Sequence, residues 1–549
     1  MLIFSVLYIG NSIYGIGKNV IYTIISFLHR LFLWRKYFVQ RQHRNLESMK
    51  HILLAGFISV IAVCAIAQPG GGTAPNKNPF LNQSFWQNKP SVDAIKAELE
   101  KGSDPAEYNS MSMDPVVLAI NAEAPNESII YLMEQKGNNV DKLTHDSRTY
   151  IFWAAMRGNV AVMQYLISKG AKIDVKDSHG LSPLNFAATG GQQNLQVYDL
   201  FLKNGENLET DLNDDGANAL LLAVGNDTSF KLTEYFQSKG LSLKSKDAEG
   251  NTAFDYAAKA GNIKIMKLLL GKGVSYTDNA MLMAAQGGRR GGNSLEVFQY
   301  LENVGIKPTV ISKKGENVLH TIVRRQGQIN VIQYFLDKGV NVNKADNEGN
   351  TVFMNASASN QDTATIGLLL PLVKDINQKN KAGATALSLA VRSNIEPVVE
   401  YLLGKGADVN VIDAKGNNLV YYLFESYNPR QSKDFQPKLQ ALQRKGLDAT
   451  APLSDGSTMY HLGVAKNDLS LIKLVHDNYS AININAANKE GLTALHKAAM
   501  VSKDNRILEY LVSIGANKEI KTSFDETAYD LASENELLAK NKVSVDFLK

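Results

Sequence analysis

Residues 488–517, NKEGLTALHKAAMVSKDNRILEYLVSIGAN, contain one complete structural unit. The opening NKEG is typical of a tight turn, because Gly491 can adopt the positive φ that a side chain would resist. Thr493 is of a residue type that caps helices, and the small apolar residues after it predict a short helix. Apolar residues recur at helical spacing in RILEYLVS, and Gly515 marks the end of this second helix. The stretch therefore predicts a turn followed by two short helices.

The same unit recurs along most of the chain. Aligning each segment on the capping residue gives thirteen positions with a mean step of about 34 residues. These positions are Asp114, Thr149, Ser182, Asn218, Thr252, Asn279, Asn317, Thr351, Thr385, Asn418, Thr458, Thr493 and Thr527. Glycines at the expected helix ends keep the same period: Gly137, Gly170, Gly205, Gly240, Gly273, Gly305, Gly339, Gly406, Gly446 and Gly515. Two such short helices cannot bury their apolar faces alone, so consecutive units are expected to stack.

Short motifs within these units carry a family resemblance. The clearest are TALHKAA at 493–499, SPLNFAA at 182–188 and TALSLAV at 385–391. They resemble the T-P-L-H-x-A-A core of the ankyrin repeat. The units near positions 279, 351 and 418 depart most from that pattern. The resemblance covers roughly residues 85–549. It implies that residues 80–549 form an all-α ankyrin-repeat solenoid of about 13 helix–turn–helix repeats with an N-terminal half-repeat cap.

The charge balance differs between the first residues and the rest. The chain has 58 Lys and Arg against 54 Asp and Glu, for a formal net charge of +4. Residues 1–67 hold seven of the basic residues and one acidic residue, so 51 basic and 53 acidic residues remain after them. This near-neutral body gives no general attraction to nucleic acid or to an anionic membrane. The one cysteine, Cys64, lies in an apolar stretch, so the repeats are expected to lack disulfides.

The N-terminal 79 residues divide into three predicted segments. Residues 1–48 contain two apolar runs and a basic, aromatic stretch, which fit either a membrane anchor or an upstream segment absent from the mature protein. Residues 49–67 have the basic start, short apolar core and final Ala-Ile-Ala typical of a secretory signal peptide. Residues 68–79 form a Gly/Pro linker. We therefore expect export to the periplasm or beyond the cell, with a membrane-anchored protein using residues 1–66 as the alternative.

Three departures from the regular repeat are expected. Phe85, Trp86 and the apolar residues after them predict a capping helix pair before the first full repeat. The segments 286–293 (QGGRRGGN) and 427–437 (YNPRQSKDFQP) lengthen the connection between paired helices. The charged residues of 527–549 fit a solvent-facing end cap.

Histidines are the main candidates for chemistry within the repeats. His320, His461 and His496 occupy one repeat position, where the family resemblance implies structural hydrogen bonds to backbone. Being in different repeats, they lack the convergent ligands of a metal site. The sequence shows no nucleophile elbow, phosphate-binding loop or zinc-protease motif. We therefore expect no enzyme activity, no catalytic residues, no metal and no cofactor.

The end of each first helix gives the candidate partner-binding residues. In the ankyrin family, the turn tips and the two positions after the Ala-Ala pair line the concave face. By this alignment they are Met156, Arg157, Lys259, Arg324, Arg325, Arg392 and Lys466. Basic residues are over-represented here, which favours an acidic protein surface as partner; alternatively, these are solvated helix ends whose cations suit the helix dipole. The prediction is a non-catalytic scaffold that binds another protein, with neither nucleic acid nor a small-molecule substrate as partner.

Overall fold

The computed structural model describes residues 77–288 and 291–549, except for the side chains of residues 430–432. The chain divides into two compact units, Met1–Lys77 and Asn78–Lys549. Every element described below belongs to the second unit. The predicted upstream segment, the signal peptide and most of the linker lie outside the described residues.

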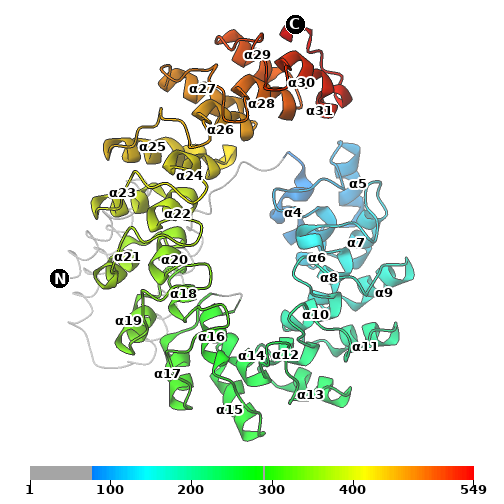
Figure 1. The fold of residues 1–549 in the computed structure, drawn as a ribbon. Coiled ribbons are helices and arrows are strands. Elements are labelled where there is room, and N and C mark those ends of the chain that lie inside the picture. Colours follow the sequence, from blue (N-terminus) through cyan, green and yellow to red (C-terminus); the bar gives the residue numbers. More distant parts are fainter. Residues whose placement is uncertain (1–76, 289–290) are drawn as a thin grey trace, which may run out of the picture. The chain divides into compact units, whose positions relative to one another are not determined.

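The described residues fold into α-helices, short 3₁₀ helices and isolated β-bridges, without a β-strand, which confirms the all-α prediction. Thirteen consecutive helix pairs make up the array, and Figure 1 shows their first and second helices as two adjacent rows. The first helices are α6 (Pro115–Asn121), α8 (Tyr150–Met156), α10 (Pro183–Thr189), α12 (Ala219–Val224), α14 (Ala253–Lys259), α16 (Asn279–Gln286), α18 (Leu319–Ile322), α20 (Val352–Ser359), α22 (Ala386–Ser393), α24 (Leu419–Glu425), α26 (Met459–Ala465), α28 (Ala494–Val501) and α30 (Ala528–Glu534). The second helices are α7 (Asn126–Met133), α9 (Val160–Ser168), α11 (Leu195–Lys203), α13 (Lys231–Ser238), α15 (Ile263–Gly271), α17 (Leu295–Asn303), α19 (Ile329–Asp337), α21 (Thr363–Leu369), α23 (Glu396–Gly404), α25 (Phe435–Arg444), α27 (Leu469–Asn478), α29 (Arg506–Ser513) and α31 (Glu536–Lys540).

An additional helix pair precedes the first full repeat, as predicted. It consists of α4 (Gln83–Gln87) and α5 (Val92–Glu100). Trp86 is fully buried in this pair, and its indole nitrogen donates to the Phe80 carbonyl at 2.7 Å. Five 3₁₀ helices complete the elements: η1 (Pro79–Leu81), η2 (His145–Ser147), η3 (Leu370–Leu372), η4 (Pro429–Asp434) and η5 (Asp546–Leu548).

Capping side chains start most of the first helices at the predicted positions. The Thr493 hydroxyl, for example, accepts from the His496 backbone N–H at 3.3 Å. The prediction is wrong at Asn317, because Val318 rather than Asn317 directly precedes α18, and at Asn279, which is the first residue of α16 rather than its cap. Its side chain instead donates to the Asn251 side chain at 2.6 Å, and Thr277 bonds Asp255 of the preceding repeat. The step from Thr252 to Asn279 is the shortest between the predicted capping positions, and side-chain bonds take the place of the usual glycine turn there.

Backbone hydrogen bonds link each turn tip to the next over much of the array. The Ala414 N–H donates to the Ala382 carbonyl at 2.9 Å, and the Lys489 N–H donates to the Asp455 carbonyl at 2.7 Å. Gly383 lies in one of these turns with a φ of +79°, and an added Cβ would come within 2.4 Å of the Ala414 nitrogen. Glycine is therefore required here both by conformation and by the closeness of the next turn.

A single hydrophobic core connects all the helix pairs. Its buried residues run from Phe80 near the start of the unit to Leu548 at its end. Rings from neighbouring repeats touch within it, as in Phe298 and Phe335, whose centroids are 5.1 Å apart at 76°. Each repeat thus completes its own core by packing on its neighbours, as the short helices require.

Asparagines join the first helices of successive repeats. The buried Asn394 amide donates to the Ser357 and Asn360 carbonyls at 2.8 and 2.9 Å. Asn360 in turn donates to the Val323 carbonyl at 2.8 Å, and Asn535 donates to the Ala499 carbonyl at 2.8 Å. These bonds satisfy carbonyls that a helix end would otherwise leave without a donor.

Tyrosines on the second helices bridge neighbouring repeats. The Tyr235 hydroxyl donates to Asp199 on the preceding second helix at 2.8 Å, and Lys239, four residues after Tyr235, bonds the same carboxylate at 3.0 Å. Tyr334 and Lys338 repeat this arrangement on Glu302. The surface layer of second helices is therefore tied together by ionic hydrogen bonds.

The two lengthened connections lie where expected. One separates α16 from α17, and the other separates α24 from α25. The second is shorter than predicted, because η4 occupies 429–434 and α25 already begins at Phe435. Pro437 falls in the first turn of α25, where its missing N–H breaks no helical hydrogen bond.

Candidate functional site

The predicted partner-binding residues all lie at or just after the C-terminal ends of first helices. Met156 ends α8 and Arg157 follows it, Lys259 ends α14, Arg324 and Arg325 follow α18, Arg392 lies in the last turn of α22, and Lys466 follows α26. Met156 and Arg157 are adjacent in sequence, as are Arg324 and Arg325, whereas Lys259, Arg392 and Lys466 come from three further repeats. We call this set the helix-end surface.

Several of these cations already have partners within the array. The Arg157 Nε donates to the Asn121 side chain at 3.1 Å, and the Arg324 Nε donates to the His320 carbonyl at 3.1 Å. Lys466 forms an ion pair of 2.9 Å with Glu425. Arg157 and Arg324 remain exposed despite these bonds, so their charges still face solvent.

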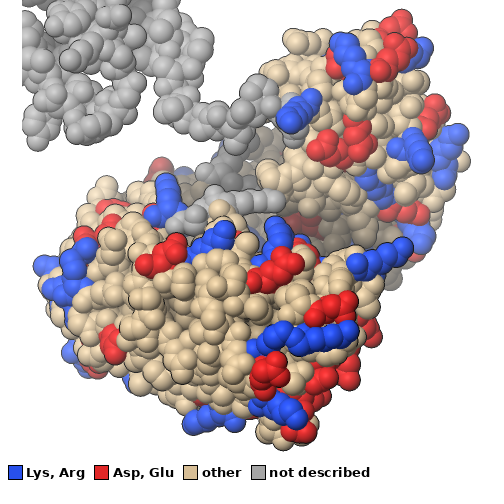
Figure 2. Space-filling view, turned by 90° about the horizontal axis from the view of Figure 1, so that it is seen from above, with Lys and Arg blue, Asp and Glu red and all other residues tan. Residues whose placement is uncertain are grey.

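The remaining cations differ in exposure. Arg325 is half-buried and donates to the Gln286 carbonyl across the repeat interface. Arg392 is exposed, with its guanidinium carbon 6.0 Å from the centroid of the Tyr422 ring. Lys259 and Met156 are half-buried. On the face drawn in Figure 2, basic and acidic side chains are interspersed, so the charge in view is mixed in sign.

The three repeat histidines make structural hydrogen bonds, as the family resemblance implies. The His461 Nδ1 lies 3.1 Å from the Thr458 nitrogen, and its Nε2 lies 2.9 Å from the Leu492 carbonyl of the next repeat. His496 bonds the Ile520 carbonyl in the same way at 2.9 Å. Burial lowers the pKa of all three histidines, His320 included, because it disfavours the charged ring. Among the described residues, no group of three or more His, Cys, Asp or Glu side chains could hold a metal ion.

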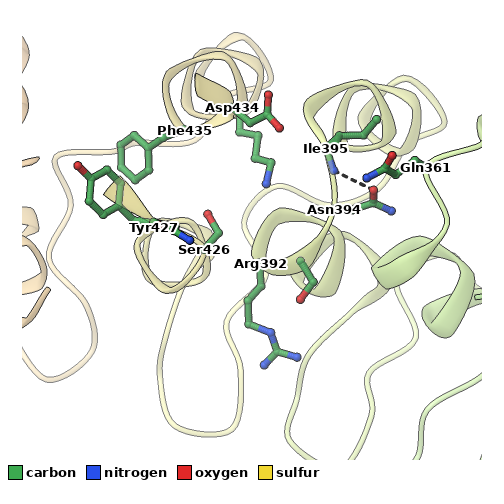
Figure 3. Close-up of a pocket in the computed structure, with 11 residues that line it drawn as sticks. Gln361, Arg392, Asn394, Ile395, Ser426, Tyr427, Asp434 and Phe435 are labelled. Carbon is green, nitrogen blue, oxygen red and sulfur yellow. Dashed lines mark hydrogen bonds between the residues drawn. The ribbon is translucent and has the colours of Figure 1, made fainter. Parts of the chain in front are cut away.

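The structure reveals a pocket that the sequence analysis did not identify. It has a volume of about 200 Å³ and lies where the lengthened connection after α24 meets the end of α22. Figure 3 shows Arg392, Asn394 and Gln361 on one side of it and Ser426 and Tyr427 on the other. Of the predicted residues, Arg392 lines this pocket.

Lys438 is the unusual residue of this pocket. It lies on α25, is 4% exposed, and donates from Nζ to the Val391 carbonyl at 3.0 Å. Burial lowers the pKa of Lys438, and the negative charge of Asp434 partly opposes that shift. Sequence reasoning had no signal for this site, because Val391 and Lys438 are far apart in the chain and meet through stacking of the repeats.

A second unusual ionisable group lies at a turn between α11 and α12. Burial, with the nearby charges of Asp211 and Asp174, raises the pKa of Glu206 to about 7. One of its carboxylate oxygens, Oε1, is buried without a hydrogen-bond partner. Sequence reasoning did not identify Glu206 either.

Comparison with known families decides what kind of array this is. A model of three ankyrin repeats matches residues 116–210, 192–280 and 281–380, and a single-repeat model matches 382–414 and 490–523. The chain belongs to the ankyrin repeat family. Ankyrin repeats are protein-interaction modules that are typically non-catalytic, which implies that this chain is a protein-interaction scaffold.

Several known proteins are similar to this chain at low identity. "Ankyrin repeat protein OPG189" of variola virus is 22% identical over 228 residues, which cover 40% of this chain and 39% of the viral protein. The human transient receptor potential cation channel subfamily A member 1 is 22% identical over 442 residues, covering 78% of this chain and 36% of the channel. An L-asparaginase of Dirofilaria immitis is 32% identical over 164 residues, covering 29% of this chain and 27% of that protein. The chain therefore spans well under half the length of these relatives.

Within the part of the chain that the structure describes, no helix has the length and apolar character needed to cross a membrane.

Proposed function

We propose that the array binds another protein through the helix-end surface and the neighbouring turn tips. The observation that carries this proposal is that the C-terminal ends of three first helices, α8, α18 and α22, place Arg157, Arg324 and Arg392 at exposed positions. Because the repeats are held by a shared core, this surface is already ordered before a partner arrives. Binding then requires little additional conformational ordering, so modest contacts give useful affinity.

Exposed arginines favour an acidic partner surface. Charge complementarity increases the association rate and discriminates against basic partners. The near-neutral body of the chain makes nucleic acid a poor partner, because such binding relies on many phosphate contacts. No catalytic step is part of this proposal.

Charge reversal on the helix-end surface tests the proposed function. The full chain carrying Arg157→Glu, Arg324→Glu and Arg392→Glu is used to recover partners from the native source by affinity purification. A matched control carries Lys203→Glu, Lys264→Glu and Lys540→Glu, which make the same charge change on exposed positions of second helices. We expect partner recovery to fall in the first variant and to persist in the control. Equal recovery in both variants would remove the helix-end surface as the binding site.

We further propose that the protein is exported after cleavage behind Ala67. The support is the signal-peptide pattern of residues 49–67. N-terminal mapping of the native protein tests this, and a chain beginning at Gln68 is the expected result. A native chain that retains residues 1–66 would instead favour the membrane-anchored alternative.

A further inference from the structure

The pocket lined by Lys438 departs from a hydrogen-bonding pattern that four other repeats share. At four interfaces between consecutive repeats, the carbonyl six residues after the capping position accepts a hydrogen bond from an asparagine amide of the next repeat. These carbonyls belong to Ala258, Val323, Ser357 and Ala499, and their donors are Asn293, Asn360, Asn394 and Asn535. The equivalent carbonyl of Val391 accepts from the Lys438 ammonium instead. In the four other repeats a neutral amide donates to this carbonyl. Stacking of the repeats therefore does not require a positive charge at this position.

Burying this charge is costly in the unliganded protein. A buried cation is normally paired with a carboxylate, because it loses its hydration on folding. No carboxylate of the described residues lies within ion-pair distance of the Lys438 ammonium. Asp434 acts on it through charge alone, and the ammonium has two donors beyond the one used for Val391.

The pocket around Lys438 is rich in hydrogen-bond donors. Arg392, which is exposed, also lines this cavity, with its guanidinium directed away from Asp434 and Gln361 in Figure 3. The Gln361 side-chain oxygen accepts from Gln326 at 3.4 Å, which leaves the Gln361 amide N–H groups available. Ser393 adds a hydroxyl to the lining. Two cations and neutral donors around one small cavity are suited to an anion.

We propose that this pocket receives the carboxylate of an aspartate or glutamate side chain presented by the partner protein. The inference rests on the proposed function, because Arg392 belongs both to the pocket and to the helix-end surface. A carboxylate would pair with Lys438 and complete the hydrogen bonding of its ammonium. Asp434 lines the same cavity and disfavours a group of higher negative charge, such as a phosphate.

Peptide binding to the purified full chain tests the proposal. The probe is a blocked pentapeptide with one central aspartate and a neutral fluorophore, and binding is followed by fluorescence anisotropy. The matched peptide has asparagine in place of aspartate. We expect the aspartate peptide to bind at least about tenfold more tightly, as hydrogen bonds to a charged group allow. Equal binding of the two peptides would overturn the proposal.

Variants locate the binding in the pocket. Lys438→Gln removes the charge but keeps an amide that can donate to the Val391 carbonyl, as asparagines do in other repeats. We expect it to weaken aspartate-peptide binding by about tenfold. Arg392→Gln changes an exposed side chain and should weaken binding in a protein that keeps its fold. Arg444→Gln, on the exposed side of α25, is the control and should leave binding unchanged.

The remaining outcomes separate this proposal from the proposed function. Unchanged peptide binding in both Lys438→Gln and Arg392→Gln overturns the pocket assignment. Free acetate that competes as well, mole for mole, as the aspartate peptide would assign the pocket to a small carboxylate and overturn the partner side chain as its occupant. Peptide binding needs no partner, so it tests the pocket even if charge reversal of the helix-end surface leaves partner recovery unchanged.

Discussion

Different side chains make the same hydrogen bonds at equivalent repeat positions in this array. The third position of the first helix is His461 in one repeat, Asp255 in another and Ser388 in a third. All three side chains close a hydrogen-bonded box with the capping threonine. Burial lowers the pKa of His461 and raises the pKa of Asp255, whereas Ser388 carries no titratable group. The stability of individual repeats therefore depends on pH in different ways.

Protonation of His461 is expected to weaken the fold. Burial lowers its pKa, so between that lowered value and its ordinary value of 6.5 the unfolded chain binds a proton that the folded chain does not. The free energy of unfolding therefore falls as the pH drops below 6.5. We expect the His461→Gln variant to show a smaller loss of stability than the unaltered chain between pH 7 and pH 5, measured by urea unfolding. An equal loss in both proteins would show that His461 does not contribute.

Glu206 is expected to act with the opposite sign. Its pKa is raised from 4.5 to about 7, so between these values the folded chain holds a proton that the unfolded chain has released. The free energy of unfolding then falls as the pH rises through this window. Glu206→Gln should remove that slope and stabilise the protein at pH 8, by less than about 1 kcal/mol because the side chain is partly solvated. A steeper slope in the variant would contradict this assignment, and urea titrations at pH 5 and pH 8 provide the measurement.

At the scale of the element, turns and helix ends set the spacing between repeats. The turn glycines adopt a positive φ, but their surroundings differ. Gly383 has the next turn against it, whereas Gly250, at the same repeat position, has no atom within 4 Å of an added Cβ. The two sites separate the effect of conformation from that of close packing.

Gly383→Ala is expected to destabilise the array more than Gly250→Ala. At Gly250, alanine has only to adopt a left-handed conformation, at a cost of about 1 kcal/mol. At Gly383, it must also push the Ala414 backbone away, which should raise the total to about 2–4 kcal/mol. The denaturant midpoints of the two variants test this prediction. Equal midpoints would mean that the turns of Gly383 and Ala414 move apart without an energetic cost.

The buried asparagines should also carry measurable stability. Asn394→Ala leaves the Ser357 and Asn360 carbonyls without their donor. Each buried carbonyl that loses its hydrogen bond costs about 1–3 kcal/mol of stability. Asn226→Ala removes a bond of 3.1 Å to the Thr189 carbonyl at an exposed site, where water replaces the donor. We expect a clear fall in stability for Asn394→Ala and less than about 0.5 kcal/mol for the control. Thermal and urea unfolding provide the comparison.

For the whole molecule, linear stacking means that each repeat depends mainly on its neighbours. Trp86→Ala should cost about 3–5 kcal/mol locally, because the indole is fully buried in the first helix pair. We expect hydrogen exchange to accelerate in α4 to α7 while α26 to α29 stay protected. Phe524→Ala, at a side chain that is 83% exposed, should leave exchange unchanged throughout. Loss of protection along the entire array after Trp86→Ala would show that it unfolds as one cooperative unit instead.

The fold was predictable from the sequence because its signals are local. A capping threonine, a turn glycine and two short apolar faces lie within each span of about 34 residues, so repetition reinforces every one of them. Asn279 was misplaced because a shortened repeat replaced the turn with side-chain bonds from Asp255. Lys438 and Glu206 were missed because their environments arise from contacts between repeats, which the local pattern does not encode.

The capping-box histidines His461 and His496 lie far from Glu206 in the chain. The stability of the two regions should therefore change differently when the pH falls. His461 and His496 lie towards the C-terminus, and their repeats should loosen first as protons accumulate. The turn at Glu206 lies nearer the N-terminus and should tighten over the same range. Mild acidification is therefore expected to move the weakest point of the array towards its C-terminal end, rather than to soften every repeat equally.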